Sequence, residues 1–189
     1  PKQLARIQRK AAYYFPIFYD ALGRSGLPYE LCYLPVIESA LNPQAHSHAG
    51  AAGLWQFMPS TGRLYGLEIN SLVDERMDPI KSTEAACLFL KSLYNMFGDW
   101  TLALADGKKD FWSIYPYLPA ETRGYVPIFI AAAYSINYAD LHGICPEAIE
   151  MTEHTDTIQT DVRQHLLQIS EILGIELDEL RRLNPQYAK

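Results

Sequence analysis

The stretch that decides the fold runs over residues 30–41 and reads ELCYLPVIESAL. Its apolar side chains recur at intervals of three and four residues, at Leu31, Leu34, Ile37 and Leu41. This spacing places them on one face of a helix, and Asn42-Pro43 supplies a stop signal directly after them. The stretch therefore predicts a helix that packs this face into a core.

Glu38 lies on the same apolar face, because it comes four residues after Leu34 and three before Leu41. Burial disfavours a charged carboxylate, and so does the negative end of the helix dipole near Asn42, so we expect a raised pKa. A carboxyl with a raised pKa suits a general acid. The alternative is a structural Glu that pairs with a buried Arg or caps a neighbouring helix.

Helical patterns also dominate the chain on both sides of this stretch. Residues 2–22 have helical periodicity with a kink or break expected at Pro16, and Asp78 before Pro79 is typical of a helix N-terminus. Further helices are expected to begin near Pro59 and to cover residues 100–105 and 121–139. No convincing β-alternation appears before residue 150, so the predicted fold class is mainly α.

Composition excludes several classes of protein. The 189 residues are 49% hydrophobic and 20% charged, which indicates a globular chain, and the net charge is −6 with no basic run longer than two residues. A nucleic-acid partner is therefore not expected. No stretch of about 18 apolar residues predicts a membrane span. Three cysteines without close spacing favour neither a zinc site nor a disulfide framework.

The segment after Glu38 lacks the second carboxylate that glycoside cleavage usually employs, because no Asp or Glu occurs between Ser39 and Leu67. It contains small residues and then aromatic and amide side chains. Gly50 and Gly53 permit a close approach of backbone to a ligand. A stacking face and an amide for sugar hydroxyls could come from Trp55, Gln56 and Phe57.

Three ordered motifs in this region and beyond resemble the lytic transglycosylase family. They are Glu38-Ser39, the run SHAGAAGLWQF over residues 47–57 followed by Pro59-Ser60-Thr61-Gly62, and the run ETRGYVP over residues 121–127. The resemblance covers roughly residues 25–145. It implies a helical, goose-lysozyme-like fold without a cofactor.

The resemblance also implies a reaction and its substrate, the glycan strands of peptidoglycan. One catalytic Glu protonates the leaving oxygen of the β-1,4 bond between MurNAc and GlcNAc, and then acts as a base while the 6-hydroxyl of the same MurNAc attacks C1. The product is a 1,6-anhydro sugar. This internal nucleophile would explain why no second carboxylate follows Glu38.

Site roles carry over by the same resemblance. Glu38 matches the acid and base, Ser39 its hydrogen-bonding neighbour, Gln56 the amide of the sugar groove, and Tyr125 the tyrosine that faces the carboxylate. Ordinary structural roles are the alternatives: a helix-end hydroxyl for Ser39, and core packing for Tyr125 and for Trp55.

One family motif, A-Y-N-x-G, is absent after the apolar run that ends at Ala105. Either this member has lost one wall of the groove, or the sequence joins at Ala105 and Asp106 two segments that are not adjacent in the natural chain. An uncapped apolar end favours the second interpretation, which predicts a chain break there, beside the groove that holds Glu38.

The tail differs from the rest of the chain. We place a helical catalytic domain at residues 1–150, a polar linker at 151–164, and a short helical segment at 165–189. The last segment resembles the helical part of a LysM glycan-binding repeat, although its opening is reduced to Asp156-Thr157-Ile158 and a closing strand is missing. A plain helical hairpin is the alternative.

Other features carry weaker expectations. His46 and His48 have no carboxylate or cysteine nearby, so no metal site is expected, and Asp74-Glu75-Arg76 is typical of a solvated turn with a salt bridge. The family implies the periplasmic side of the bacterial envelope, with any outer-membrane lipid anchor upstream of Pro1. A hydrolytic muramidase of the same fold and a catalytically silent peptidoglycan-binding module are the alternative functions.

Overall fold

A computed structural model describes residues 2–97, 120–145, 155–160 and 162–187, and within these ranges the chain is helical and contains no strand. The main body consists of α1 (Lys2–Ser25), η1 (Tyr29–Tyr33), α2 (Leu34–Ser39), α3 (Pro59–Leu64), α4 (Pro79–Phe97), α7 (Ala120–Asn137) and η3 (Asp140–His142). The tail forms α8 (Leu166–Leu173) and α9 (Leu177–Leu183). The predicted fold class is confirmed.

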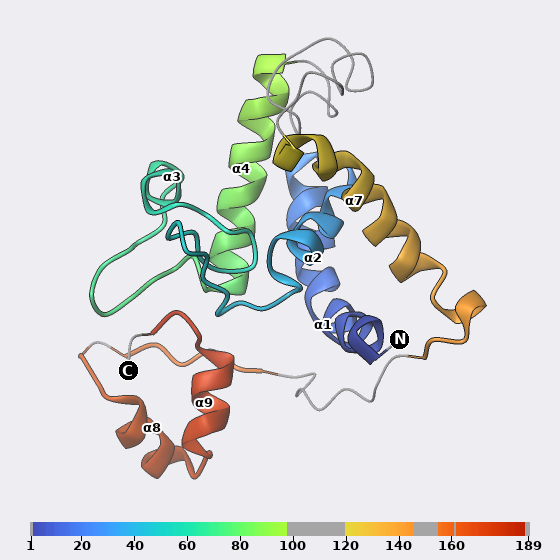
Figure 1. Cartoon of the computed structure of the whole chain (residues 1–189). Helices are drawn as coiled ribbons and strands as arrows, with labels where there is room; N and C mark the ends of the chain where they lie inside the picture. Colours follow the sequence, from blue (N-terminus) through green and yellow to red (C-terminus); the bar gives the residue numbers. More distant parts are fainter. Residues whose placement is uncertain (1, 98–119, 146–154, 161, 188–189) are drawn as a thin grey trace.

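The long helix α1 lies at the centre of the main body (Figure 1). It packs against α4 and against η1 and α7, while α2 contacts η1 and α7. The core between these helices contains fully buried side chains such as Phe18, Leu22, Leu41 and Leu54. A second, smaller core joins Phe57 and Leu67 to Ala85 and Ala86 of α4.

Of the kink or break expected at Pro16, the break is absent, because α1 continues through this residue to Ser25. Proline removes one backbone donor and crowds the preceding turn. Pro16 is exposed, whereas Tyr14, Phe15 and Phe18 around it are buried. Packing of these aromatic side chains holds the helix together at a position where local propensity opposes it.

The helix expected over residues 30–41 is divided into two shorter elements. Residues Tyr29–Tyr33 form a 3-10 turn, and α2 starts at Leu34 with Pro35 in its first turn. The helix ends at Ser39, earlier than the expected stop at Asn42, because Ala40 and Leu41 adopt φ values of 50° and 55°. Glu38 is therefore in the last turn of α2.

The start of α4 agrees with the sequence pattern. Asp78 Oδ1 accepts hydrogen bonds of 2.9 Å from the backbone N–H groups of Ile80 and Lys81. Pro79 is the first residue of the helix. Asp78 thus satisfies donors that the first helical turn leaves unpaired.

The tail helices lie within the expected helical segment 165–189, with Gly174 in a left-handed conformation between them. The expected helix at residues 100–105 and the predicted break between Ala105 and Asp106 lie outside the described residues. The predicted boundaries of the catalytic domain and of the linker stay predictions.

Candidate active site

The end of α2 holds Glu38 in a partly buried position. The backbone N–H of Ala40 donates to Val36 O at 3.1 Å and that of Leu41 to Pro35 O at 3.2 Å, which closes the helix end. Leu41 is fully buried, which fixes this left-handed turn despite its lack of glycine. The turn therefore holds Glu38 between the core and the loop that follows.

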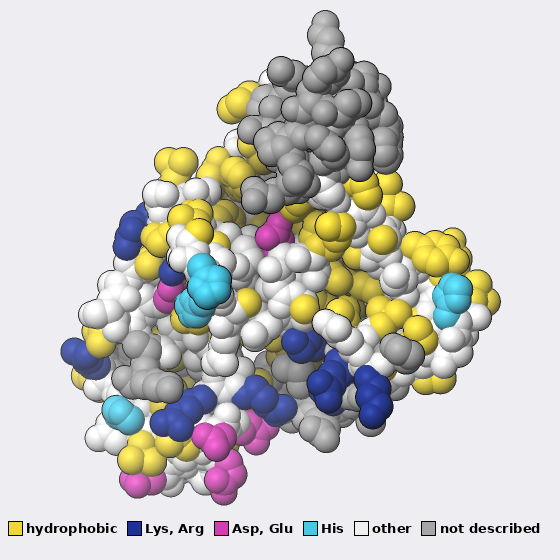
Figure 2. All heavy atoms as spheres, viewed as in Figure 1, with side chains coloured by type: hydrophobic (Ala, Val, Ile, Leu, Met, Phe, Trp, Pro, Cys, Tyr) yellow, Lys and Arg dark blue, Asp and Glu magenta, His cyan; other side chains and the backbone are white. Residues whose placement is uncertain are grey.

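A cation supports the same helix end. Lys and Arg side chains gather over the start of α1 (Figure 2), and Lys10 Nζ of this helix donates to the carbonyl oxygen of Ala40 at 3.0 Å. A positive charge at a helix C-terminus is favourable. Burial is the larger cause that lowers the pKa of Lys10, and the positive charge of the neighbouring Arg9 lowers it further.

Tyr125 reaches Glu38 from α7. Its hydroxyl donates to Glu38 Oε1 at 2.8 Å, across 87 positions of sequence. Burial raises the pKa of Glu38, and the hydrogen bond from Tyr125 opposes this effect by stabilising the carboxylate. Burial and the neighbouring Glu38 raise the pKa of Tyr125, so this hydroxyl keeps its proton and stays a donor.

Ser39 connects α2 to the next loop. Its Oγ lies 2.9 Å from the carbonyl oxygens of both Pro35 and Leu54. A hydroxyl has one proton, so it donates to one of the two at a time. This geometry agrees with the alternative that Ser39 is a helix-end hydroxyl. It also holds the loop that contains Leu54 close to the end of α2, where Glu38 lies. A role of Ser39 in substrate binding stays a prediction.

The loop over residues 45–57, which we call the substrate loop after its predicted role, is held by its own backbone. His46 pairs with Ala52, and Ala52 with Phe57, as isolated antiparallel bridges. Gln56 has a φ of 49°, and its Nε2 donates to Ala45 O at 3.2 Å and to Gly53 O at 2.8 Å. The Gln56 side chain is thereby fixed, and it remains a candidate for contact with sugar hydroxyls.

The two aromatic side chains of this loop pack mainly into the protein. Trp55 Nε1 donates to Thr83 Oγ1 at 2.9 Å, and its ring lies edge-on against Phe18. Phe57 is 5% exposed and packs against Phe89. Phe57 therefore offers little ring surface for a sugar. The contacts of Trp55 agree with the alternative that it packs in the core. The substrate-binding roles of both residues stay predictions.

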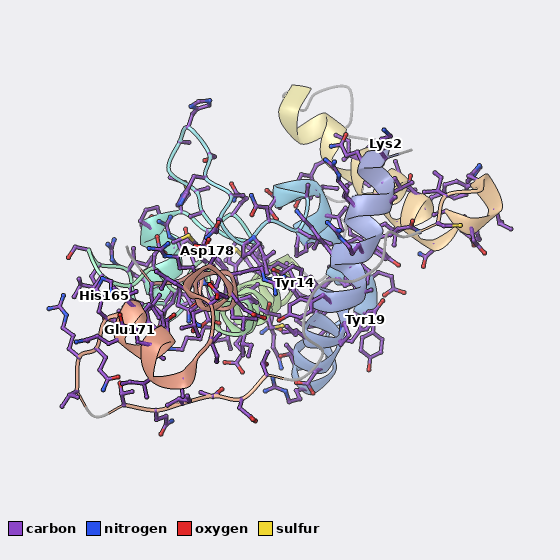
Figure 3. The ribbon with its side chains drawn as sticks, turned by 90° about the horizontal axis from the view of Figure 1, so that it is seen from below. Lys2, Tyr14, Tyr19, His165, Glu171 and Asp178 are labelled. Atoms are coloured by element: carbon purple, nitrogen blue, oxygen red, sulfur yellow. The ribbon has the colours of Figure 1, made fainter. Side chains whose placement is uncertain are left out.

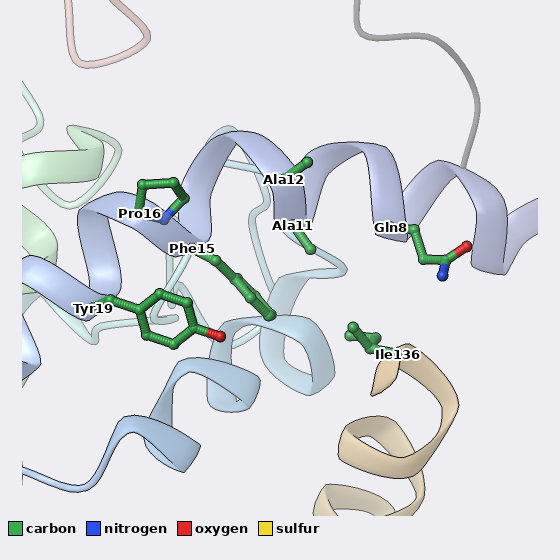
Figure 4. A pocket seen from close by; sticks show the side chains of 7 residues that line it. All are labelled: Gln8, Ala11, Ala12, Phe15, Pro16, Tyr19 and Ile136. Atoms are coloured by element: carbon green, nitrogen blue, oxygen red, sulfur yellow. The ribbon is translucent and has the colours of Figure 1, made fainter. Parts of the chain in front are cut away.

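Two surface hollows are not lined by Glu38, Gln56 or Tyr125. The first, of about 390 Å³, lies beside α1 and is bordered mainly by apolar side chains (Figure 4): Gln8, Ala11, Ala12, Phe15, Pro16, Tyr19 and Ile136. The second, of about 370 Å³, lies between α9 and the residues after α2. The candidate site is thus defined by the hydrogen-bonded group around Glu38.

Neither a metal site nor a membrane span is found in the part of the chain that the structure describes. No group of three His, Cys, Asp or Glu side chains there is suited to hold a metal ion. No helix in the same ranges is long and apolar enough to cross a membrane.

The sequence pattern does not predict the burial of the segment Asp74-Glu75-Arg76, for which a solvated turn is expected. The expected ion pair exists, with Arg76 Nη2 2.7 Å from Asp74 Oδ2, but Glu75 and Arg76 are both buried. Glu75 accepts a hydrogen bond from the backbone of Glu68 and pairs with Lys81. Gly53 and Gly62 are the residues of the sequence that could have indicated this close packing, because a side chain at either position would contact Arg76.

Comparisons with known proteins find two family matches in this chain. Residues 15–106 match the transglycosylase SLT domain family, and residues 154–189 match the LysM-like domain of lytic transglycosylase MltD. The second match includes the predicted helical segment 165–189 and begins eleven residues before it. The first match includes Glu38-Ser39 and the run over residues 47–57, whereas the run over residues 121–127 lies between the two matches.

Curated relatives give the same result. The chain is 33% identical over 192 aligned residues to membrane-bound lytic murein transglycosylase D of Escherichia coli K12, covering 89% of this chain and 42% of the relative. It is 28% identical over 168 residues to the soluble lytic murein transglycosylase of the same strain, covering 74% of this chain and 26% of the relative. The chain thus spans less than half the length of either relative.

The family expected from the three ordered motifs is confirmed by these matches: the chain belongs to the lytic transglycosylases with an SLT domain, and it has an MltD-type LysM-like segment at its C-terminal end.

Proposed function

We propose that this protein is a peptidoglycan lytic transglycosylase in which Glu38 is the single catalytic acid and base. The observation that carries the proposal is the contact between Glu38 and Tyr125 in a chain of this family. Burial favours the protonated carboxyl that must first give up a proton. Tyr125 stabilises the carboxylate that remains.

In the proposed reaction Glu38 transfers its proton to the oxygen of the β-1,4 bond between MurNAc and GlcNAc, and the bond to C1 breaks. The carboxylate then takes the proton of the MurNAc 6-hydroxyl while that oxygen bonds to C1. This step returns Glu38 to its starting protonation state and forms a 1,6-anhydro ring. Burial raises the pKa of Glu38 and the hydrogen bond from Tyr125 opposes the rise, which suits a carboxyl that first gives up a proton and then takes one back.

We also propose the place of action and the role of the tail. Peptidoglycan as substrate implies the periplasmic side of the envelope, and an outer-membrane lipid anchor upstream of Pro1 is part of this proposal. The catalytic domain corresponds to residues 1–150 and the linker to 151–164. The LysM-like segment at 165–189 would contact the glycan.

Digestion of purified peptidoglycan tests the proposed function. We expect soluble products with 1,6-anhydroMurNAc ends, lighter by one water than products of hydrolysis when analysed by mass spectrometry. Reducing ends would instead identify a hydrolytic muramidase. Binding without cleavage would identify a peptidoglycan-binding module, and either result would overturn the proposal.

The hydrogen bond of Tyr125 leads to a prediction on pH dependence. In Tyr125→Phe the carboxylate loses its donor, so the pKa of Glu38 rises further and the high-pH limb of the rate profile moves to higher pH. Loss of one hydrogen bond to a charged group, about 1.5–3 kcal/mol, predicts a rate lower by about tenfold or more.

Cleavage rates between acid and alkaline pH measure this effect. Tyr134→Phe is the matched control, because Tyr134 lies on the same helix and its hydroxyl contacts His142. An unchanged pH profile in Tyr125→Phe would contradict the assignment of Tyr125.

A further inference from the structure

Arg76 is a buried arginine whose guanidinium reaches two separate parts of the chain. Its side chain is 8% exposed. Nη1 donates to the carbonyl oxygens of Gly50 at 2.8 Å and Phe57 at 3.0 Å, while Nε and Nη2 donate to the two carboxylate oxygens of Asp74 at 2.9 Å and 2.7 Å. All three guanidinium nitrogens are therefore occupied.

The two carbonyl groups belong to the substrate loop, and they lie on both sides of Gln56 in the sequence. The Arg76 backbone also touches this loop, because a Cβ added to Gly53 would lie 1.7 Å from Arg76 O. Arg76 thus closes the substrate loop at Gly50 and Phe57, and Ser39 connects the same loop to the helix of Glu38 at Leu54.

The C-terminal segment contacts the partner of Arg76. The backbone N–H of Asp74 donates to Gln186 O at 2.8 Å, and Val73 forms an isolated antiparallel bridge with Tyr187. The two parts also approach each other beside α9, where Asp178, Arg181 and Pro185 line one hollow with Tyr14 and with residues 42–44. Figure 3 labels Asp178 of α9 and Tyr14 of α1. The C-terminal segment therefore lies against the main body at two places.

We propose that Arg76 is a positioning residue for the substrate loop, and that the docked C-terminal segment holds Arg76 in place through Asp74. The contacts form one continuous path, from Gln186 to Asp74, from Asp74 to Arg76, and from Arg76 to Gly50 and Phe57. In this arrangement the LysM-like segment supports the geometry of the glycan site in addition to any glycan that it binds itself.

The planar fork of arginine is essential to this role. It donates to a carboxylate with two nitrogens and still has a third nitrogen for the two carbonyls, whereas a lysine ammonium is a single point of charge. Arg76→Lys therefore keeps the positive charge but loses some of the hydrogen bonds that join Asp74 to the substrate loop. We expect Gly50 and Phe57 to lose their common donor in this variant.

Kinetics with soluble glycan strands test the role of Arg76, and this test rests on the proposed transglycosylase function. Arg76→Lys and Asp74→Asn should raise KM on the order of tenfold while kcat changes less, because the loop that binds substrate is loosened and Glu38 is untouched. Arg24→Lys is the matched control, since Arg24 is exposed and its ion pairs with Asp20 and Glu84 lie at the surface.

Hydrogen exchange of backbone amides separates positioning from general stability. In Arg76→Lys we expect faster exchange at Ala52, Gly53 and Phe57, whose N–H groups are bonded within the substrate loop, with no change in α1. Equal acceleration in all segments, or an unchanged KM, would overturn the inference. If the wild type yields no anhydro product, the proposed function fails, and exchange alone decides whether Arg76 holds the loop.

A cross-link tests the docking of the C-terminal segment. Residues opposite each other in an antiparallel bridge are close enough for a disulfide, so Val73→Cys with Tyr187→Cys should oxidise readily in a Cys145→Ser background that removes the exposed thiol. The oxidised protein should keep the wild-type KM and slow exchange in the substrate loop. Failure to cross-link, or loss of activity on cross-linking, would contradict docking.

Discussion

Glu38→Gln is expected to abolish measurable cleavage of glycan strands, with a loss of at least about 10²-fold in rate. The amide keeps the shape of the side chain, and its oxygen can still accept the hydrogen bond of Tyr125, but it has no acidic proton to transfer. No second carboxylate is proposed to take part in the proton transfers, so the loss in rate should exceed this minimum. Initial rates of product release, measured by chromatography, give the value.

Glu30→Gln is the matched control for this substitution, because Glu30 is an exposed carboxylate of η1 at the surface. It should cleave at the wild-type rate. A Glu38→Gln variant that cleaves within a factor of a few of wild type would contradict the assignment of Glu38.

The same substitution has an expected effect on stability. Because the folded protein raises the pKa of Glu38 above its ordinary value of 4.5, ionisation of this group opposes folding, and the cost appears as the pH rises through and above this value. Glu38→Gln removes the cost, so its free energy of unfolding should equal or exceed that of the wild type at neutral pH. Chemical denaturation at acid and neutral pH measures the difference.

Gly53→Ala is expected to destabilise the protein by at least about 3 kcal/mol and to lower activity strongly. Its Cβ would lie 1.7 Å from Arg76 O and 2.6 Å from Arg76 C, and its φ of 85° is strained for any residue with a side chain. The backbone of Arg76 would have to move away, which would separate the substrate loop from its support.

Gly50→Ala separates the two causes of this effect. Gly50 has a similar φ of 93°, but a Cβ there would meet nothing within 4 Å. Only the conformational strain remains, about 1–2 kcal/mol. Denaturation curves of both variants measure the contrast, and an equally small effect in Gly53→Ala would show that Arg76 does not constrain the loop.

Local sequence patterns predicted those parts of the fold that depend on neighbouring residues. The N-cap at Asp78 and the helices of the tail follow from residue types within one turn. The position of Glu38 between core and surface follows from the apolar spacing around it. Each of these features depends on periodicity or capping, which the sequence displays directly.

Long-range contacts could not be predicted by the same means. The contact of Tyr125 with Glu38 spans 87 positions, and only the resemblance to a family indicated it. The continuity of α1 through Pro16 and the early end of α2 at Ser39 depend on how adjacent side chains such as Phe18 and Leu41 pack into the core. A solvated Arg76 is expected because adjacent charges are typical of surfaces, and the two carbonyl groups that accept its hydrogen bonds lie 19 and 26 residues away in the sequence.

Cleavage in water labelled with heavy oxygen tests the central claim most directly. If Glu38 directs the MurNAc 6-hydroxyl to C1, no solvent oxygen enters the glycan, and mass spectrometry should find unlabelled 1,6-anhydro products. A product that contains one heavy oxygen at a new reducing end would show that water attacks C1, and it would contradict the assignment of lytic transglycosylase activity to this site.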